Sequence, residues 1–154
     1  MVGRLIDRAE DREELCQDVF MKVYEKIAEF NFQSKLSTWV ATIAYRQAIN
    51  HLRKKKIAIR DIPEEDQFTN YFVADDQTDA LAERDSEEHL LKLIDRLPIQ
   101  YKTVLTLYHL DGKNYIEIGE ITGMPEGTVK NYRFRARNLL KESVKKHLGK
   151  EEWI

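Results

Sequence analysis

Hydrophobic residues recur at intervals of three and four positions through most of the chain, which is the spacing of one face of an α-helix. Polar segments containing glycine or proline separate several of these stretches, and such segments end helices. The pattern therefore predicts an all-α protein. The expected helices cover residues 10–29, 36–55, 86–97, 99–110 and 115–122, followed by a last helix from Pro125 to Leu148.

The first two helices each pair an apolar stripe with a polar surface. The single cysteine, Cys16, lies beside the first stripe and is expected to be a small packing residue. Ser34 precedes the second helix and is expected to cap its N-terminus. The first stripe consists of Leu15, Val19, Val23 and Ile27, and the second helix is expected to bury Leu36, Trp39, Val40, Ile43 and Leu52.

Residues 115–140 predict two helices joined by a tight turn. Gly123 supplies the left-handed conformation that ends the first helix, and Pro125 suits the first turn of the second. The second helix divides into an apolar side and a basic, amide-bearing side. The apolar side carries Val129, Ala136, Leu140, Val144 and His147, and the other side carries Lys130, Asn131, Phe134, Arg135 and Asn138.

Such a helix is suited to the major groove, where lysine and arginine reach guanine or phosphate and asparagine binds adenine. The alternative is a solvated amphipathic helix of an ordinary bundle. Charge favours nucleic acid, because the net charge of −2 hides an uneven distribution. Residues 1–59 carry a net charge of +3, residues 60–89 carry −9 and residues 90–154 carry +4.

The segment Gly127-Thr128-Val129-Lys130, with Arg135-Ala136-Arg137 after it, resembles the promoter-recognition helix of the sigma-70 family. The most similar branch is the extracytoplasmic-function (ECF) sigma factors, in which this domain, region 4, contacts the −35 promoter element. The match departs at Tyr132 and Arg133, where the family commonly has arginine and leucine. We expect Arg133 to bury its stem and keep its head in water. The resemblance assigns the −35 contacts to Thr128, Lys130, Asn131, Arg135 and Arg137.

The first half resembles region 2 of the same family. Residues 11–20 are similar to region 2.2, whose exposed side binds the largest polymerase subunit. Residues 37–53 are similar to the regions that open and contact the −10 element, although Thr42, Tyr45 and Asn50 stand where the family often has Arg, Arg and Asp. The resemblance assigns polymerase contacts to Glu14, Gln17, Asp18 and Lys22, and −10 contacts to Phe32, Ser34, Lys35, Arg46, Arg53 and Lys54.

Aromatic residues beside a basic helix suit single-stranded DNA, because every base offers a face for stacking. Trp39 is expected to be a core residue, and Phe30 is either a core residue or available for stacking. The loop with Phe32 is the better candidate for binding a captured base. The resemblance implies a partial region 2 over residues 1–56, because the family's region 2 normally begins with further helices. With so little core, the first half is expected to expose apolar surface unless a second copy, an exchanged helix or the second half covers it.

Residues 57–85 are acidic and polar, and they predict a linker rather than a packed element. They are either a solvating tether or, as the family implies, a segment that runs through the polymerase. Residues 86–149 then form a four-helix region 4 domain. The expected organisation is two small helical domains joined by this acidic linker.

Enzymatic function is not expected, because the four histidines are scattered and no glycine-rich phosphate loop is present in the sequence. We expect no metal or other cofactor. We expect a cytoplasmic sigma factor without membrane insertion, whose partners are core RNA polymerase, promoter DNA and an anti-sigma factor. The alternatives are a stand-alone helix-turn-helix regulator and a truncated sigma-like protein that is unable to open promoters.

Overall fold

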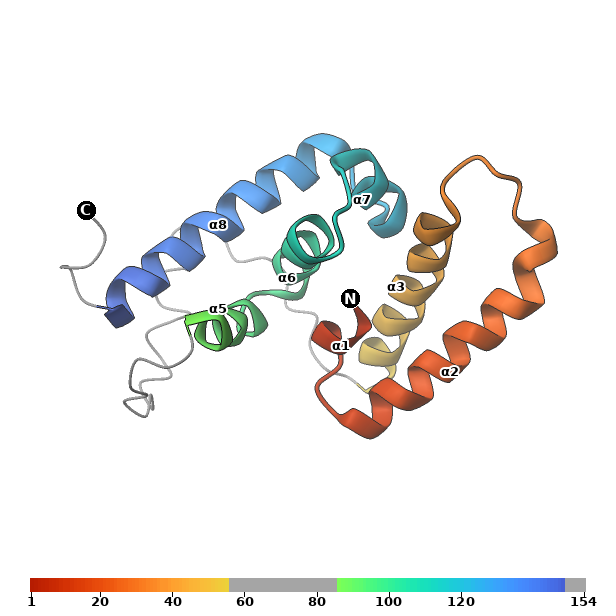
Figure 1. Ribbon diagram of the computed structural model, residues 1–154, viewed down its shortest axis with the longest axis horizontal. Coiled ribbons are helices and arrows are strands. Elements are labelled where there is room, and N and C mark those ends of the chain that lie inside the picture. Colours follow the sequence, from red (N-terminus) through yellow and green to blue (C-terminus); the bar gives the residue numbers. More distant parts are fainter. Residues whose placement is uncertain (56–85, 149–154) are drawn as a thin grey trace.

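The structure is a computed structural model that describes residues 1–55 and 86–148, and all regular elements in these ranges are helical (Figure 1). The all-α prediction is therefore confirmed. The predicted linker, residues 57–85, and the expected stop at Gly149 lie outside the described residues. The elements are α1 (Val2–Leu5), α2 (Ala9–Lys26), the short 3₁₀-helix η1 (Ile27–Glu29), α3 (Leu36–Lys54), α5 (Ser86–Asp95), α6 (Ile99–Leu105), the π-helix η3 (Thr106–Leu110), α7 (Tyr115–Thr122) and α8 (Glu126–Leu148).

Helices α2 and α3 form an antiparallel pair joined by the loop of residues 30–35 (Figure 1). Leu15 of α2 clusters with Ala48 and Leu52 of α3, and with residues of α1. A helix pair buries only the strip that faces its partner. The wider packing predicted for this half is therefore wrong at Cys16, which is exposed, at Ile27, which is 45% exposed, and at Leu36, which is 49% exposed.

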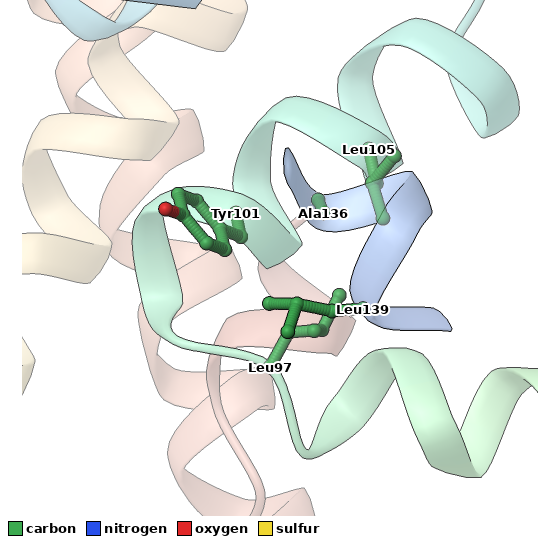
Figure 2. Packing of buried hydrophobic residues seen from close by; sticks show 5 residues of the cluster. All are labelled: Leu97, Tyr101, Leu105, Ala136 and Leu139. Carbon is green, nitrogen blue, oxygen red and sulfur yellow. The ribbon is translucent and has the colours of Figure 1, made fainter. Parts of the chain in front are cut away.

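The second half is built around the contact of α6 with α8. Leu97, Tyr101 and Leu105 belong to one buried cluster with residues of α8 (Figure 2). Ala136 and Leu139 face them from α8. The buried side of α8 thus runs through Leu139 rather than the predicted Leu140, which is half-buried. This small rotation also buries Ser143, whose hydroxyl donates to the carbonyl of Leu139 at 2.9 Å.

A neighbouring cluster holds the two helices of the predicted helix-turn-helix on α6 and η3. Its buried members are Val104, Leu107, Ile118, Ile121 and Val129. None of the five is more than 2% exposed. This cluster fixes α7 and the start of α8 against the rest of the second half.

The two halves also pack against each other, mainly through α3 on α7 and α1 on α6 (Figure 1). Ala41 and Tyr45 of α3 contact the cluster around Ile118, and Ile99 of α6 contacts the cluster around Leu15. The second half therefore covers part of the first, which is one of the three coverings considered from the sequence.

Apolar surface remains on α2, on the side turned away from this contact. Phe20 is 70% exposed, Met21 is 59% exposed and Tyr24 is 80% exposed. In the predicted stripe of α2, Val19 is buried and Val23 is half-buried, and Ile43, which α3 was expected to bury, is half-buried. A second copy of the chain as the cover of this surface stays a prediction.

Candidate nucleic-acid interface

A capping box starts α7. The side-chain oxygen of Asn114 accepts a hydrogen bond from the Glu117 amide at 2.9 Å, and a Glu117 carboxylate oxygen accepts one from the Asn114 amide at 2.9 Å. These two bonds satisfy donors that a helix start otherwise leaves unpaired. The pKa of Glu117 is lowered, mainly by the Asn114 amide and also by Lys35.

A short turn joins α7 to α8, and it depends on glycine at two positions, Gly119 and Gly123. Gly123 has a φ of 77°, in the left-handed region, and its amide donates to the carbonyl of Gly119 at 2.8 Å. A Cβ atom at Gly119 would lie 2.9 Å from the carbonyl oxygen of Met124, so the turn lies directly on this position. The predicted helix over Tyr115–Thr122 and its glycine stop are confirmed.

The outer side of α8 carries an exposed set of polar and basic side chains. The apolar side chain of Phe134 lies between them and is 64% exposed. Phe134, Arg137, Asn138 and Lys141 line an open hollow of about 390 Å³. Lys130 and Asn131 are exposed one turn earlier, and Thr128 and Arg135 are half-buried. The structure thus leaves the predicted −35 set accessible along one helix, with Arg135 and Thr128 nearer its buried side.

Lys130 has a counterion within its own helix. Its amino group lies 2.8 Å from a carboxylate oxygen of Glu126, four residues earlier, and this contact raises the pKa of Lys130. Both side chains are about half exposed. A surface pair of this kind contributes little to stability, so a phosphate can replace Glu126 as the partner of Lys130 at small cost.

Arg133 does not keep its head in water, so that prediction is wrong. Its guanidinium carbon lies 4.1 Å from the ring centre of Tyr108, and its Nη1 donates to the hydroxyl of Tyr115 at 2.7 Å. A cation held over an aromatic face is worth about 0.5–2 kcal/mol, more where water is excluded. Burial together with the charges of Arg133 and Arg137 lowers the pKa of His109 beside Tyr108.

The loop before α3 forms the second accessible surface. Phe32 is 84% exposed and has a φ of 60°, which only a few per cent of residues other than glycine adopt. Its ring centre lies 4.7 Å from that of Phe30, which in turn lies 5.4 Å from that of Trp39. An open hollow of about 580 Å³ is lined by residues of this loop and its ends, including Phe32, Ser34 and Lys35.

The predicted cap at Ser34 is wrong. Helix α3 begins at Leu36 with Lys35 at the N-cap position and without a side-chain cap bond, and the Ser34 hydroxyl contacts the Lys35 carbonyl at 3.5 Å. Arg46, Arg53 and Lys54 are exposed on α3. Arg53 and Lys54 lie in its last turn, at the opposite end from the loop. The predicted −10 residues therefore do not form one cluster. Some lie in the loop, Arg46 lies in the middle of α3, and Arg53 and Lys54 lie at its end.

The predicted polymerase-binding residues share the exposed surface of α2. Glu14, Gln17, Asp18 and Lys22 are all exposed. Lys22 pairs with Glu25 at 3.4 Å, and both side chains are about half exposed. The structure therefore leaves all four residues accessible to a partner.

Comparison with known proteins identifies both halves. The family model described as "Sigma-70 region 2" matches residues 1–57, and the one described as "Sigma-70, region 4" matches residues 87–140. The chain is 32% identical over 149 residues to the ECF RNA polymerase sigma factor SigW of Bacillus subtilis (strain 168), which covers 92% of this chain and 80% of that protein. The chain belongs to the ECF sigma factors of the sigma-70 family.

This ECF sigma factor is also similar to the ECF RNA polymerase sigma-E factor of Haemophilus influenzae (strain ATCC 51907 / DSM 11121 / KW20 / Rd), at 29% identity over 94% of this chain and 79% of that protein. Among solved structures, it resembles the sigma factor RpoE in complex with the anti-sigma factor NepR from Bartonella quintana. The TM-score is 0.69 at 23% identity, over 94% of this chain and 87% of that one, which shows the shared fold.

Residues 1–55 and 86–148 contain no group of three or more histidine, cysteine, aspartate or glutamate side chains that could hold a metal ion. Within the same ranges, no helix combines the length and apolar character that a membrane span requires.

Sequence reasoning on this ECF sigma factor missed the roles of Glu117 and Tyr108. Glu117 both caps α7 and contacts the other half, where its carboxylate lies 3.0 Å from the amino group of Lys35. The spacing Asn114-x-x-Glu117 is a capping-box signal that could have shown the first role. The contact of Tyr108 with Arg133 depends on η3 meeting α8, with Tyr115 of α7 beside them. Spacing along the chain does not show this contact.

Proposed function

We propose that this ECF sigma factor directs RNA polymerase to promoter DNA by binding the core enzyme and two promoter elements. The observation that carries the proposal is the accessible side of α8, where Lys130 and Asn131 lie unobstructed on the recognition helix of a sigma-type region 4. Promoter recognition needs such a surface, and burial of this side would have excluded it.

Helix α8 is proposed to enter the major groove at the −35 element. Asparagine binds adenine with two hydrogen bonds, and lysine and arginine bind guanine edges or phosphates. The exposed Phe134 adds an apolar contact of the kind that thymine methyl groups make. The residues proposed to make −35 contacts are Thr128, Lys130, Asn131, Arg135 and Arg137.

The loop before α3 is proposed to bind an unpaired base of the −10 element. The exposed ring of Phe32 and the hollow beside it could hold a base by stacking. A strained backbone at an exposed aromatic is typical of a binding position. Ser34 and Lys35 would contact the same strand, and Arg46, Arg53 and Lys54 would contact phosphates farther along α3.

Core RNA polymerase is proposed to bind the exposed side of α2 at Glu14, Gln17, Asp18 and Lys22. The solved relative is in complex with an anti-sigma factor. We propose that a partner of this class also binds the present chain, in the cytoplasm. The proposed organisation has sigma region 2 residues over 1–56 and a region 4 domain over 86–149, joined by residues 57–85.

One observation favours a second candidate function. Lys35, in the loop before α3, is already paired with Glu117, and one side of α3 is packed against α7. A chain that kept this arrangement on the polymerase would bind the −35 element without opening the promoter. The alternative is thus a sigma-like protein that occupies promoters without initiating transcription.

Transcription by purified core polymerase tests the proposal. The chain is mixed with bacterial core enzyme and a library of promoters, and run-off transcripts are sequenced. Promoter-selective transcripts that require the chain support the sigma function. Binding of the polymerase and of −35 DNA without transcripts supports the second candidate, and DNA binding without polymerase binding would indicate a stand-alone regulator.

A further inference from the structure

Two side chains of the recognition helix depart from the usual family pattern, and both are used inside the protein. Tyr132 meets the buried ring of Tyr101 edge to face, with ring centres 5.2 Å apart. Arg133 places its guanidinium over Tyr108 and donates to the hydroxyl of Tyr115. The first half of α8 is thus attached to the rest of the domain by ring contacts on two adjacent residues.

The π-helix η3 presents Tyr108 to this contact. The Asp111 amide donates to the Thr106 carbonyl at 3.0 Å, five residues earlier, which makes this turn wider than an α-helical one. The ring of Tyr108 stacks on that of Tyr115, with ring centres 5.1 Å apart and planes inclined by 23°. Arg133 of α8 completes a stack that joins η3, the start of α7 and α8.

The same stack reaches the accessible side of α8 through Lys130. The amino group of Lys130 lies 5.6 Å from the ring centre of Tyr115, and Arg133 contacts the hydroxyl of that tyrosine one helical turn later. Tyr115 therefore holds two cations of α8 that are three residues apart. This pair of contacts acts together with the buried packing of Val129, Ala136 and Leu139 on the rotation of α8 about its own axis, and so on the direction of Lys130 and Asn131.

We propose that Arg133 is a positioning residue for promoter recognition, which orients Lys130 and Asn131 through Tyr108 and Tyr115 without contacting DNA itself. This role rests on the proposed function, since it concerns how the same helix recognises the −35 element. Arg133 is half-buried, and its buried Nε has no hydrogen-bond acceptor within the described residues. A planar guanidinium stacks on a ring and bonds at its edge, which a lysine ammonium does not reproduce.

Three variants separate positioning from direct DNA contact. Arg133→Leu removes the charge, the stack and the hydrogen bond. Arg133→Lys keeps the charge, and Tyr115→Phe removes only the acceptor of the hydrogen bond. Lys146→Leu is the control, because it removes one positive charge from an exposed position near the far end of the same helix.

The measurement uses the full chain and a duplex selected by the wild-type chain from a randomised −35 library. Fluorescence anisotropy gives the affinity for this duplex and for its single-base variants at several salt concentrations. We expect Arg133→Lys and Tyr115→Phe each to lower the discrimination between the duplexes at least about threefold, since one correct base pair is worth roughly 5- to 150-fold. The slope of log affinity against log salt should stay at the wild-type value in all three variants.

A nuclear magnetic resonance titration of His109 supplies a readout that does not involve DNA. Arg133 is one of two cations that lower the pKa of this histidine. Arg133→Leu should therefore raise the pKa of His109, whereas Tyr115→Phe should leave it unchanged. The control Lys146→Leu should leave both the pKa of His109 and the discrimination between duplexes unchanged.

Two results would overturn the role of Arg133. A loss of about one unit of salt slope in Arg133→Leu, with full discrimination in Tyr115→Phe, would identify Arg133 as a phosphate contact. Unchanged discrimination in Arg133→Lys and Tyr115→Phe would show that the stack does not orient the recognition helix. A wild-type chain that selects no preferred duplex would instead overturn the proposed function, and the His109 titration would still report on the stack.

Discussion

The carboxylate of Glu117 lies 3.0 Å from the amino group of Lys35, so the residue that caps α7 in one half is the counterion of a residue in the loop before α3 in the other half. The hydroxyl of Thr38 also faces this carboxylate, at 3.5 Å. Beside it, the amino group of Lys113 donates to the Ser37 hydroxyl at 2.8 Å. Three polar contacts thus join the start of α3 to α7 and to the turn before it, and any other anion that binds Lys35 competes with Glu117.

Replacing Glu117 with glutamine should release Lys35 while keeping the cap, because glutamine also serves in a capping box. Lys35 is 74% exposed, so its pair with Glu117 is close to a surface ion pair, worth about 0.2–1 kcal/mol. We therefore expect Glu117→Gln to raise the affinity for a −10 single-stranded oligonucleotide by up to about fivefold. Fluorescence anisotropy at low salt measures this change.

Glu120→Gln is the matched control, since Glu120 is exposed on the same helix. It should leave the affinity of the oligonucleotide unchanged. An equal gain of affinity in both variants would mean that the net charge of the chain, rather than the contact of Glu117 with Lys35, governs the affinity for the oligonucleotide.

The same contact should depend on pH in one direction. The pKa of Glu117 is lowered in the folded chain, chiefly by the Asn114 amide and then by Lys35. Its stabilising contribution is therefore complete above the unfolded-state pKa of about 4.3 and is lost as the pH falls through the lower, folded value. The difference in melting temperature between the wild type and Glu117→Gln should be constant from pH 7 to pH 5 and shrink below about pH 4.5. A difference that grows in acid would contradict this assignment.

Charge reversal at Asp18 should weaken polymerase binding without unfolding the chain. Asp18 is exposed on α2, in the set proposed to contact the core enzyme. We expect Asp18→Arg to lower the affinity for core polymerase at least about tenfold, because unpaired like charges at an interface cost several kcal/mol. Glu87→Arg, an exposed reversal on α5, is the control. Full promoter-selective transcription with Asp18→Arg would show that Asp18 does not contact the polymerase.

The core of the second half should be sensitive at Leu97. This side chain is 3% exposed and packs between Tyr101 and Leu139 in the cluster of Figure 2. Leu97→Ala should lower the free energy of unfolding by about 2–4 kcal/mol, measured by urea denaturation. Leu110→Ala, at a residue that is 53% exposed, should change it by less than about 1 kcal/mol. Equal effects of the two would contradict the assigned core.

Local signals along the chain were sufficient for the longer helices and for the family, but not for α1 or for the change to a π-helix at Thr106. The stripe around Ile118 and Ile121, followed by Gly123, predicted α7 with its observed bounds. Local chemistry also predicted the accessible positions of Lys130 and Asn131. These features depend on neighbours a few residues away, so the sequence carries them directly.

Features that depend on distant partners could not be predicted in the same way. Arg133 was expected in water because only its own helix was considered, whereas Tyr108 and Tyr115 come from elements that the fold brings to it. Tyr45 was noted as a missing charge, and its packing against the second half follows from how α3 meets α7. Leu139 replaced Leu140 in the core because the rotation of α8 is set by α6.

Promoter selection by a chain with two substitutions in α8 tests whether this helix recognises the −35 element. Core polymerase is combined with the wild-type chain or with Lys130→Ala/Arg135→Ala, and run-off transcripts from a library randomised in the −35 element are sequenced. We expect the wild type to enrich one −35 sequence and the variant to lose this enrichment while it still binds the polymerase. An unchanged −35 preference in the variant would contradict the assignment of α8 as the promoter-recognition helix.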